Sequence, residues 1–282
     1  MPSKFTLIKP VLSLAIAFSA AAGFVFYAHH FPAELAACMA GVFLLSAGAA
    51  ALNQFQEREA DALMERTRNR PVPSGSVKAS SAMAISVILA ATGTVLLLLF
   101  TGWLPALLGL GNLIWYNGVY TPMKRRSHFA VLAGALNGAV PPVIGWTAAG
   151  GALTDPEILF LAFFIYTWQI PHFWLLLMMH GDDYRKAGFR TVNERISPAL
   201  QPVFIMAWIV ATAVSTLFLP FFGIIRSESM VMVIITAVVL MVAVMAVLLF
   251  RGGSAKNYRR AFILFNLFML ITFLLVIADQ FA

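Results

Sequence analysis

The sequence predicts an all-α, polytopic membrane protein with nine transmembrane helices, and three observations support this fold class. First, 61% of the 282 residues are apolar, 11% are charged and the mean hydropathy is +0.86, a composition far outside that of soluble proteins. Second, the apolar residues form long uninterrupted runs instead of the alternation typical of β-barrel strands. Third, one membrane topology places nearly all lysine and arginine residues on the same side.

Each predicted span is an apolar run of the length that a bilayer requires, about 20 residues, and each is bounded by charged residues, glycine or proline. In chain order the spans are 10–28, 35–52, 78–100, 103–121, 129–149, 157–179, 199–222, 229–250 and 261–280. The first begins after Lys9 and contains "SAAAG", which also fits a cleaved secretory signal, but its apolar run continues through "FVFYA" and is long enough to span. The spans leave no room for a soluble domain, so we expect one membrane domain over residues 1–282.

The positions of the basic residues predict the orientation, because loops rich in lysine and arginine stay cytoplasmic. With the N-terminus inside, all of the 19 lysine and arginine residues except Arg226 lie on the cytoplasmic side. The C-terminus is then outside, and the long loops 53–77 and 180–198 are cytoplasmic. We interpret the net charge of +7 as membrane orientation, without a nucleic-acid partner, in an integral membrane protein.

The most highly charged segment is "NQFQEREADALMERTRNRP", residues 53–71. If the second span continues as a helix beyond the membrane, one polar stripe recurs every four residues: Asn53, Glu57, Asp61 and Glu65. Like charges at this spacing repel each other, so a compensating cation is expected. Arg58 and Arg66 are candidates for ion pairs at a solvated helix end, and a metal site is the alternative interpretation.

A second acidic group follows the sixth span, where "WQIPHFWLLLMMHGDDYRKAG" ends in Asp182, Asp183 and Tyr184. On a continuous helix these acids lie below Trp168 and His172 on one face. Two acidic groups on one side of the membrane, each followed by arginines, suit a polyphosphate held through Mg²⁺, which prefers hard oxygen ligands. The segment "YTPMKRRS" adds Lys124, Arg125 and Arg126 on that side, although membrane anchoring also explains this trio.

These motifs together resemble the UbiA-type intramembrane prenyltransferases, and within that superfamily the protoheme IX farnesyltransferases, or haem O synthases. The resemblance covers residues 53–188 and includes the acid stripe with "MERTRNRP", "YTPMKRR", "GAVPPVIGW" and "WQIPHFW" with "DDYRKAG". It implies a UbiA-like helical bundle with a central cavity open to the cytoplasmic side. Three places differ from the family pattern: Glu57 stands where aspartate is usual, "FRTVNE" follows Gly188, and "KPVLSL" lacks an arginine after Lys-Pro.

The activity that the resemblance implies is transfer of the farnesyl group of farnesyl diphosphate to a vinyl group of haem b, with addition of water, giving haem O and diphosphate. The implied catalytic residues are Asn53, Glu57, Asp61, Asp182 and Asp183. Of these, Asn53, Glu57, Asp61 and Asp183 are expected to hold Mg²⁺. The implied substrate-binding residues are Arg66, Arg70, Tyr120, Lys124, Arg125, Asn137, Trp168, His172 and Tyr184.

We expect the acceptor pocket to lie between the fifth and sixth spans and to be lined by Trp146, Trp168, His172 and Trp174, a large apolar surface that suits a flat porphyrin. A histidine inside a span is rare and usually faces a cavity. His172 therefore either contacts the haem, as an axial ligand or otherwise, or satisfies a backbone carbonyl that Pro171 leaves free.

Two other classes of function stay open at this point. A different UbiA-type enzyme prenylates an aromatic or quinone-precursor acceptor with the same acids. A non-enzymatic carrier or channel needs polar groups along several spans, whereas the acids here lie at or beyond span ends. The expected partners are the two substrates, the lipid bilayer and, from the resemblance, a haem A synthase or a terminal oxidase as assembly partner.

Overall fold

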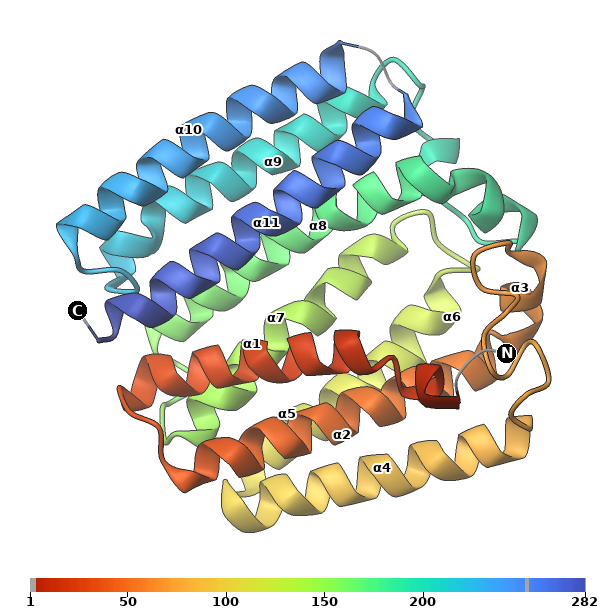
Figure 1. Ribbon diagram of the computed structural model, residues 1–282, viewed down its shortest axis with the longest axis horizontal. Coiled ribbons are helices and arrows are strands. Elements are labelled where there is room, and N and C mark those ends of the chain that lie inside the picture. Colours follow the sequence, from red (N-terminus) through yellow and green to blue (C-terminus); the bar gives the residue numbers. More distant parts are fainter. Residues whose placement is uncertain (1–3, 252–253, 282) are drawn as a thin grey trace.

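The computed structural model describes residues 4–251 and 254–281, and within these ranges every regular element is a helix (Figure 1). The long helices are α1 (Pro10–Ala28), α2 (Ala33–Gln56), α4 (Ala79–Phe100), α5 (Trp103–Ile114), α7 (Ala130–Ala148), α8 (Pro156–Lys186), α9 (Gln201–Phe218), α10 (Glu228–Phe250) and α11 (Ala255–Asp279). The shorter elements are η1 (Lys4–Ile8), α3 (Arg58–Leu63), η2 (Trp115–Tyr120), α6 (Thr121–Met123), η3 (Val192–Glu194) and η4 (Leu219–Phe222). The all-α class predicted from the hydropathy is confirmed.

The helices pack as two groups that meet at α7 and α8 (Figure 1). One apolar core joins α1, α2, α4, α5 and α7, and includes Phe24, Leu45 and Ile144. The other joins α7 to α11 and includes Phe164 and Phe265. Large apolar side chains on the outer faces of α4, α10 and α11, such as Leu99 and Leu240, are exposed, as expected for helices that contact lipid.

Eight helices among the described residues are long and apolar enough to cross a membrane. They correspond to eight of the nine predicted spans, and the protein is an integral membrane protein. The remaining predicted span, 103–121, is helical from Trp103 to Met123 but is divided into α5, the π-helical turn η2 and α6. The count of nine therefore stays a prediction.

Two helices depart from the continuous course that the sequence analysis assumed. The second span ends at Gln56, and a short second helix, α3, continues to Leu63 before the chain becomes extended at Met64. Helix α8 contains a residue with non-helical backbone angles, His180 (φ −132°, ψ 17°). Both departures lie at the polar ends of spans and decide which acids face the interior.

Helix α1 contacts α7 closely through two glycines. A Cβ atom added to Gly145 would lie 1.8 Å from the carbonyl oxygen of Ala20, and one added to Gly23 would lie 2.0 Å from that of Pro142. Neither position accommodates a side chain, so the two backbones are in direct contact, as in small-residue helix pairs of membranes. This contact holds together two helices that both line the cavity described below.

The termini lie at opposite ends of the bundle (Figure 1), as an odd number of crossings requires. We therefore expect a reporter that is active only outside the cytoplasm to be active when fused after Phe281 and inactive when fused in the loop after Met123. A reporter active only in the cytoplasm should give the opposite pattern. Cytoplasmic activity of the C-terminal fusion would exclude nine crossings and imply that the segment 103–123 does not cross the membrane.

Candidate active site

A cavity of about 610 Å³ lies between the two groups of helices and is lined by residues of α1, α2, α5, η2, α7, α8 and α11. Its charged lining residues are Lys9, Glu57, Asp61, Arg66, Arg70 and Lys124. All six follow or precede spans at the end of the bundle where α3 and α6 lie (Figure 1). The rest of the lining is mainly apolar and aromatic, with a few amides. The cavity is therefore charged at one end and apolar beyond it.

The predicted acid stripe is present for its first three members. Asn53 lies in the last turn of α2, Glu57 is the residue between α2 and α3, and Asp61 lies in α3. The backbone hydrogen bonds from Glu57 N to Asn53 O and from Asp61 N to Glu57 O keep the four-residue spacing across the junction. All three residues are buried, with 2%, 5% and 0% exposure. Glu65 is exposed and outside the stripe, because the chain leaves the helix at Met64.

The cations that compensate these acids differ from those expected. Lys124 Nζ lies 2.6 Å from Glu57 Oε1, and one nitrogen of Arg70 donates to both carboxylate oxygens of Asp61, at 2.9 and 2.8 Å. Arg58, one of the candidates for this pairing, is partly exposed and pairs with Glu59 instead. The acids are thus neutralised by residues that lie near them only in the folded chain.

The Glu57–Lys124 pair shifts the protonation of both groups toward the charged form. Burial raises the pKa of the Glu57 carboxyl, but the Lys124 charge and the hydrogen bonds from Lys124 and Asn53 outweigh it and hold the pKa below its ordinary value. Burial lowers the pKa of Lys124, but the charge and hydrogen bond of Glu57 outweigh it and hold the pKa above its ordinary value. The site therefore contains a stable carboxylate and a stable ammonium at neutral pH.

Lys9 is a site residue that the sequence analysis counted only toward membrane orientation. It is the N-cap of α1 and has left-handed backbone angles (φ 44°, ψ 61°), which cost a residue with a side chain about 1–3 kcal/mol. Its Nζ donates to Asn53 Oδ1 at 3.3 Å, and Asn53 Nδ2 donates to Glu57 Oε2 at 2.9 Å. The strained backbone thus places a third basic side chain beside the acid stripe. The Lys-Pro pair at the start of the first span was the only signal in the sequence.

Asp182 and Asp183 do not line the cavity, in contrast to the expectation. Because α8 departs from helical angles at His180, these acids no longer lie below His172 on one face. The Asp182 side chain is 81% exposed and pairs with Arg185 at 2.9 Å, and Asp183 is partly exposed. Within the described ranges, no three His, Cys, Asp or Glu side chains form a cluster suited to a metal ion. Asp183 therefore does not join Asn53, Glu57 and Asp61 as the fourth predicted Mg²⁺ ligand in this structure.

Most predicted substrate-binding residues do line the cavity: Arg66, Arg70, Tyr120, Lys124, Asn137, Trp168, His172 and Tyr184. Arg66 donates to the Tyr184 hydroxyl oxygen at 3.0 Å, and Lys124 Nζ lies 5.0 Å from the centroid of the Tyr120 ring. Arg125 is exposed and absent from the lining. Its neighbour Lys124 takes the inward position, since consecutive residues in a turn point in different directions.

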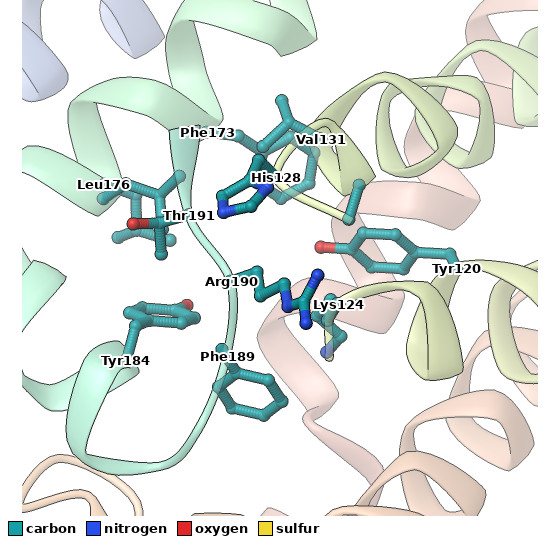
Figure 2. A pocket seen from close by; sticks show the side chains of 12 residues that line it. Tyr120, Lys124, His128, Val131, Phe173, Leu176, Tyr184, Phe189, Arg190 and Thr191 are labelled. Atoms are coloured by element: carbon teal, nitrogen blue, oxygen red, sulfur yellow. The ribbon is translucent and has the colours of Figure 1, made fainter. Parts of the chain in front are cut away.

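A small pocket of about 40 Å³ adjoins the charged end of the cavity and shares six lining residues with it: Tyr120, Lys124, Phe173, Leu176, Tyr184 and Phe189. Figure 2 shows the segment that follows Gly188 passing beside this pocket, with the Arg190 side chain near Tyr120 and Lys124. Arg190 N donates to the Lys124 carbonyl oxygen at 3.0 Å. The segment that differs from the family pattern therefore forms part of the rim of the cavity.

The apolar part of the cavity contains two of the four residues expected to line an acceptor pocket, Trp168 and His172. Trp146 is instead buried against Phe26 and Tyr27 of α1 and donates to Asp155 at 3.0 Å. Trp174 packs against Phe204 and Trp208 of α9. Both tryptophans were assigned wrongly because spacing along a helix does not show which neighbouring helix each face contacts. His172 bonds to Asn266 of α11 and not to a backbone carbonyl freed by Pro171.

Comparison with known proteins places this architecture in one family. The model of the UbiA prenyltransferase family matches residues 13–272. The chain is 47% identical over 221 residues to the protoheme IX farnesyltransferase of Geobacter sulfurreducens, covering 77% of this chain and 80% of the relative. It is 36% identical over 270 residues to the protoheme IX farnesyltransferase of Oleidesulfovibrio alaskensis, covering 94% and 92%.

The fold is also similar to that of a solved structure, a UbiA homolog from Archaeoglobus fulgidus bound to GPP and Mg²⁺, with a TM-score of 0.70, 15% identity, and coverage of 97% of this chain and 99% of that chain. At this identity the likeness shows the fold alone. Together with the family match over most of the chain, it identifies the protein as a member of the UbiA prenyltransferase family.

Proposed function

We propose that this protein is a protoheme IX farnesyltransferase, which transfers the farnesyl group of farnesyl diphosphate to a vinyl group of haem b, with addition of water to the resulting cation, and produces haem O and diphosphate. The observation that carries the proposal is the 47% identity to a relative with this name, over 80% of that relative's length. The cavity supports it, because one end is charged and the remainder is large and apolar. An isoprenoid diphosphate is likewise charged at one end and apolar along the rest of its length.

The charged end of the cavity suits the diphosphate. Its basic side chains are Lys9, Arg66, Arg70 and Lys124, and the last three alone outnumber its two acids, so its net charge is positive. Lysine and arginine neutralise phosphate oxygens through charge-assisted hydrogen bonds. In a UbiA-type transfer the carbon–oxygen bond to the diphosphate breaks, and the leaving group gains charge as it does so. We propose that these four side chains stabilise that charge.

The donor atoms near the acid stripe fit Mg²⁺, which takes carboxylate and amide oxygens together with phosphate oxygens. Glu57, Asp61 and the amide oxygen of Asn53 would hold it, and when bound it would supply Lewis-acid neutralisation of the leaving diphosphate. The UbiA homolog from Archaeoglobus fulgidus, which has the same fold, is bound to GPP and Mg²⁺, and this supports a metal ion in the proposed reaction. Since Lys124 and Arg70 already neutralise the acids, substrate binding requires both cations to exchange a carboxylate partner for a phosphate partner. We do not assign Asp182, Asp183 or Arg125 to the binding of Mg²⁺ or diphosphate.

The apolar part of the cavity suits the prenyl chain and the acceptor. Aromatic rings of Tyr116, Tyr120, Trp168 and Phe173 line it, and such rings stabilise a carbocation by up to about 2 kcal/mol per desolvated contact. We propose that the farnesyl group extends from the charged end toward Trp168, with the porphyrin near His172.

We place the charged end on the cytoplasmic side of the bacterial inner membrane, in agreement with the positions of the basic residues. A haem A synthase or a terminal oxidase remains a proposed assembly partner.

The acceptor is tested directly by product analysis. We expect the purified protein, incubated with Mg²⁺, farnesyl diphosphate and haem b, to form haem O, identified by mass and absorbance. A parallel reaction with 4-hydroxybenzoate or a naphthoate in place of haem b should give no prenylated product. Prenylation of either aromatic acid with no consumption of haem b would contradict the proposed acceptor and leave a different UbiA-type prenyltransferase as the function.

The acid stripe is tested by comparing two aspartates. We expect Asp61→Asn to lower the rate of haem O formation by about 10²–10³-fold, the effect typical of losing one group that stabilises developing charge. Asp182→Asn should keep nearly full activity, because its side chain is exposed and pairs only with Arg185. Chelation of Mg²⁺ should stop the wild-type reaction reversibly. Equal effects of the two substitutions, or activity in excess chelator, would contradict the roles assigned to Asp61 and Mg²⁺.

The Glu57–Lys124 pair predicts a pH dependence of stability. We expect Lys124→Met to cost about 3–5 kcal/mol at neutral pH, because it leaves a buried carboxylate without its partner. The carboxyl pKa of Glu57 is lowered in the folded protein, so the stability from this pair is present above the ordinary value of 4.5 and is lost as the pH falls below it. The pKa of Lys124 is raised in the folded protein, so on the alkaline side the stability from this pair is lost only above pH 10.5, the ordinary pKa of lysine.

Thermal unfolding in detergent measures both effects. The difference in Tm between the wild type and Lys124→Met should be constant from about pH 6 to pH 9 and should shrink below about pH 4.5. Arg125→Met is the matched control, since Arg125 is exposed, and it should leave Tm nearly unchanged. A difference that is equally large at pH 3 would show that the ion pair does not determine the stability of this region.

A further inference from the structure

The hydrogen bonds of Asn266 define the orientation of its amide. Asn266 lies on α11 and lines the cavity beside His172 of α8. Its Nδ2 donates to the carbonyl oxygen of Phe262, one turn earlier in the same helix. Its Oδ1 lies 2.9 Å from His172 Nδ1. A backbone carbonyl only accepts hydrogen bonds, so the amide nitrogen must face Phe262 and the amide oxygen must face His172.

This orientation determines the tautomer of His172. The amide oxygen also only accepts, so His172 Nδ1 must carry the proton that it donates. In the neutral imidazole the other nitrogen, Nε2, then has a free lone pair. The opposite amide orientation would bring the Asn266 oxygen against the Phe262 carbonyl oxygen and would lose that bond, leaving at most one bond, from Asn266 Nδ2 to an unprotonated His172 Nδ1. Two hydrogen bonds therefore select one tautomer.

The ring of His172 is also held in position by its neighbours. Its centroid lies 4.8 Å from that of Trp168, 4.9 Å from that of Phe262 and 5.5 Å from that of Phe173. Trp168 is itself fixed by a 3.3 Å hydrogen bond to the carbonyl oxygen of Phe265. Throughout the described part of the chain, the only side-chain hydrogen bond of His172 is the one through Nδ1. Nε2 is left available to a molecule in the cavity.

We infer that Asn266 is a positioning residue that holds His172 in the Nδ1–H form and so presents Nε2 as an axial ligand to the iron of haem b. This inference rests on the proposed function. A histidine that binds a metal usually donates its other ring N–H to an oxygen acceptor, which orients the ring and increases the basicity of the ligating nitrogen. Asn266 Oδ1 is such an oxygen acceptor for the Nδ1–H group of His172. A neutral amide, unlike a carboxylate, does so without adding a charge inside the membrane.

The test is a titration of the purified full-length protein with haem b, followed by the Soret band. We expect His172→Ala to lose the spectrum of histidine-bound iron and added imidazole to restore it. Asn266→Leu should bind haem b about 10–100-fold more weakly, the usual effect of losing the outer partner of a metal-binding histidine. Asn266→Asp keeps the acceptor and adds charge, so it should retain ligation and lower the reduction potential of the bound haem.

Thr272→Val is the matched control, because Thr272 is buried on the same helix and its hydroxyl bonds only within that helix. It should bind haem b as the wild type does. In addition, ¹⁵N NMR of the protein without haem should show His172 protonated at Nδ1. If Asn266→Leu does not fold, the spectrum and potential of Asn266→Asp decide.

The outcomes separate this inference from the proposed function. Wild-type spectra and affinity in both Asn266 variants, with haem O still formed, would overturn the role of Asn266 and leave the proposed function standing. Protonation of His172 at Nε2 would overturn it as well. A wild-type protein that neither binds nor converts haem b would overturn both.

Discussion

The ion pair between Glu57 and Lys124 is the interaction on which the rest of the site depends. It joins the end of α2 to the residue that follows α6, and hydrogen bonds extend it through Asn53 to Lys9 at the start of α1. The start of α1, the end of α2 and the residue after α6 are thus tied together at one end of the bundle. A buried carboxylate without this partner would be costly, so the fold and the charge arrangement are stabilised together.

The cavity separates two chemical tasks along its length. At one end, buried charges act in surroundings where water screens them little, which strengthens their effect on a leaving anion. Farther in, the polar groups carry no formal charge and include the imidazole of His172 and the amides of Asn137 and Asn266. Neutral groups are tolerated at membrane depth when they are hydrogen-bonded. The protein can therefore neutralise a diphosphate without exposing its apolar region to charge.

Hydropathy alone predicted the helix bounds to within a few residues for most spans, because bilayer thickness sets their length. Spacing predicted the face shared by Asn53, Glu57 and Asp61. It failed for Asp183, since one non-helical residue, His180, redirects the chain. The cations that pair with the acids, and the partner of His172, are contacts between distant segments, and no local pattern reports them.

The π-helical turn η2 has a consequence for how the chain can vary. It closes with a hydrogen bond from Thr121 N to Tyr116 O, one residue longer than an α-helical bond. Each residue in a helix advances the direction of its side chain by about 100°. Loss of one residue here would restore regular α-helical hydrogen bonding. The segment after the turn would then rotate about the helix axis relative to α5, and Lys124 would no longer face Glu57. Related chains that keep this lysine should therefore show no single-residue gap between Trp115 and Thr121.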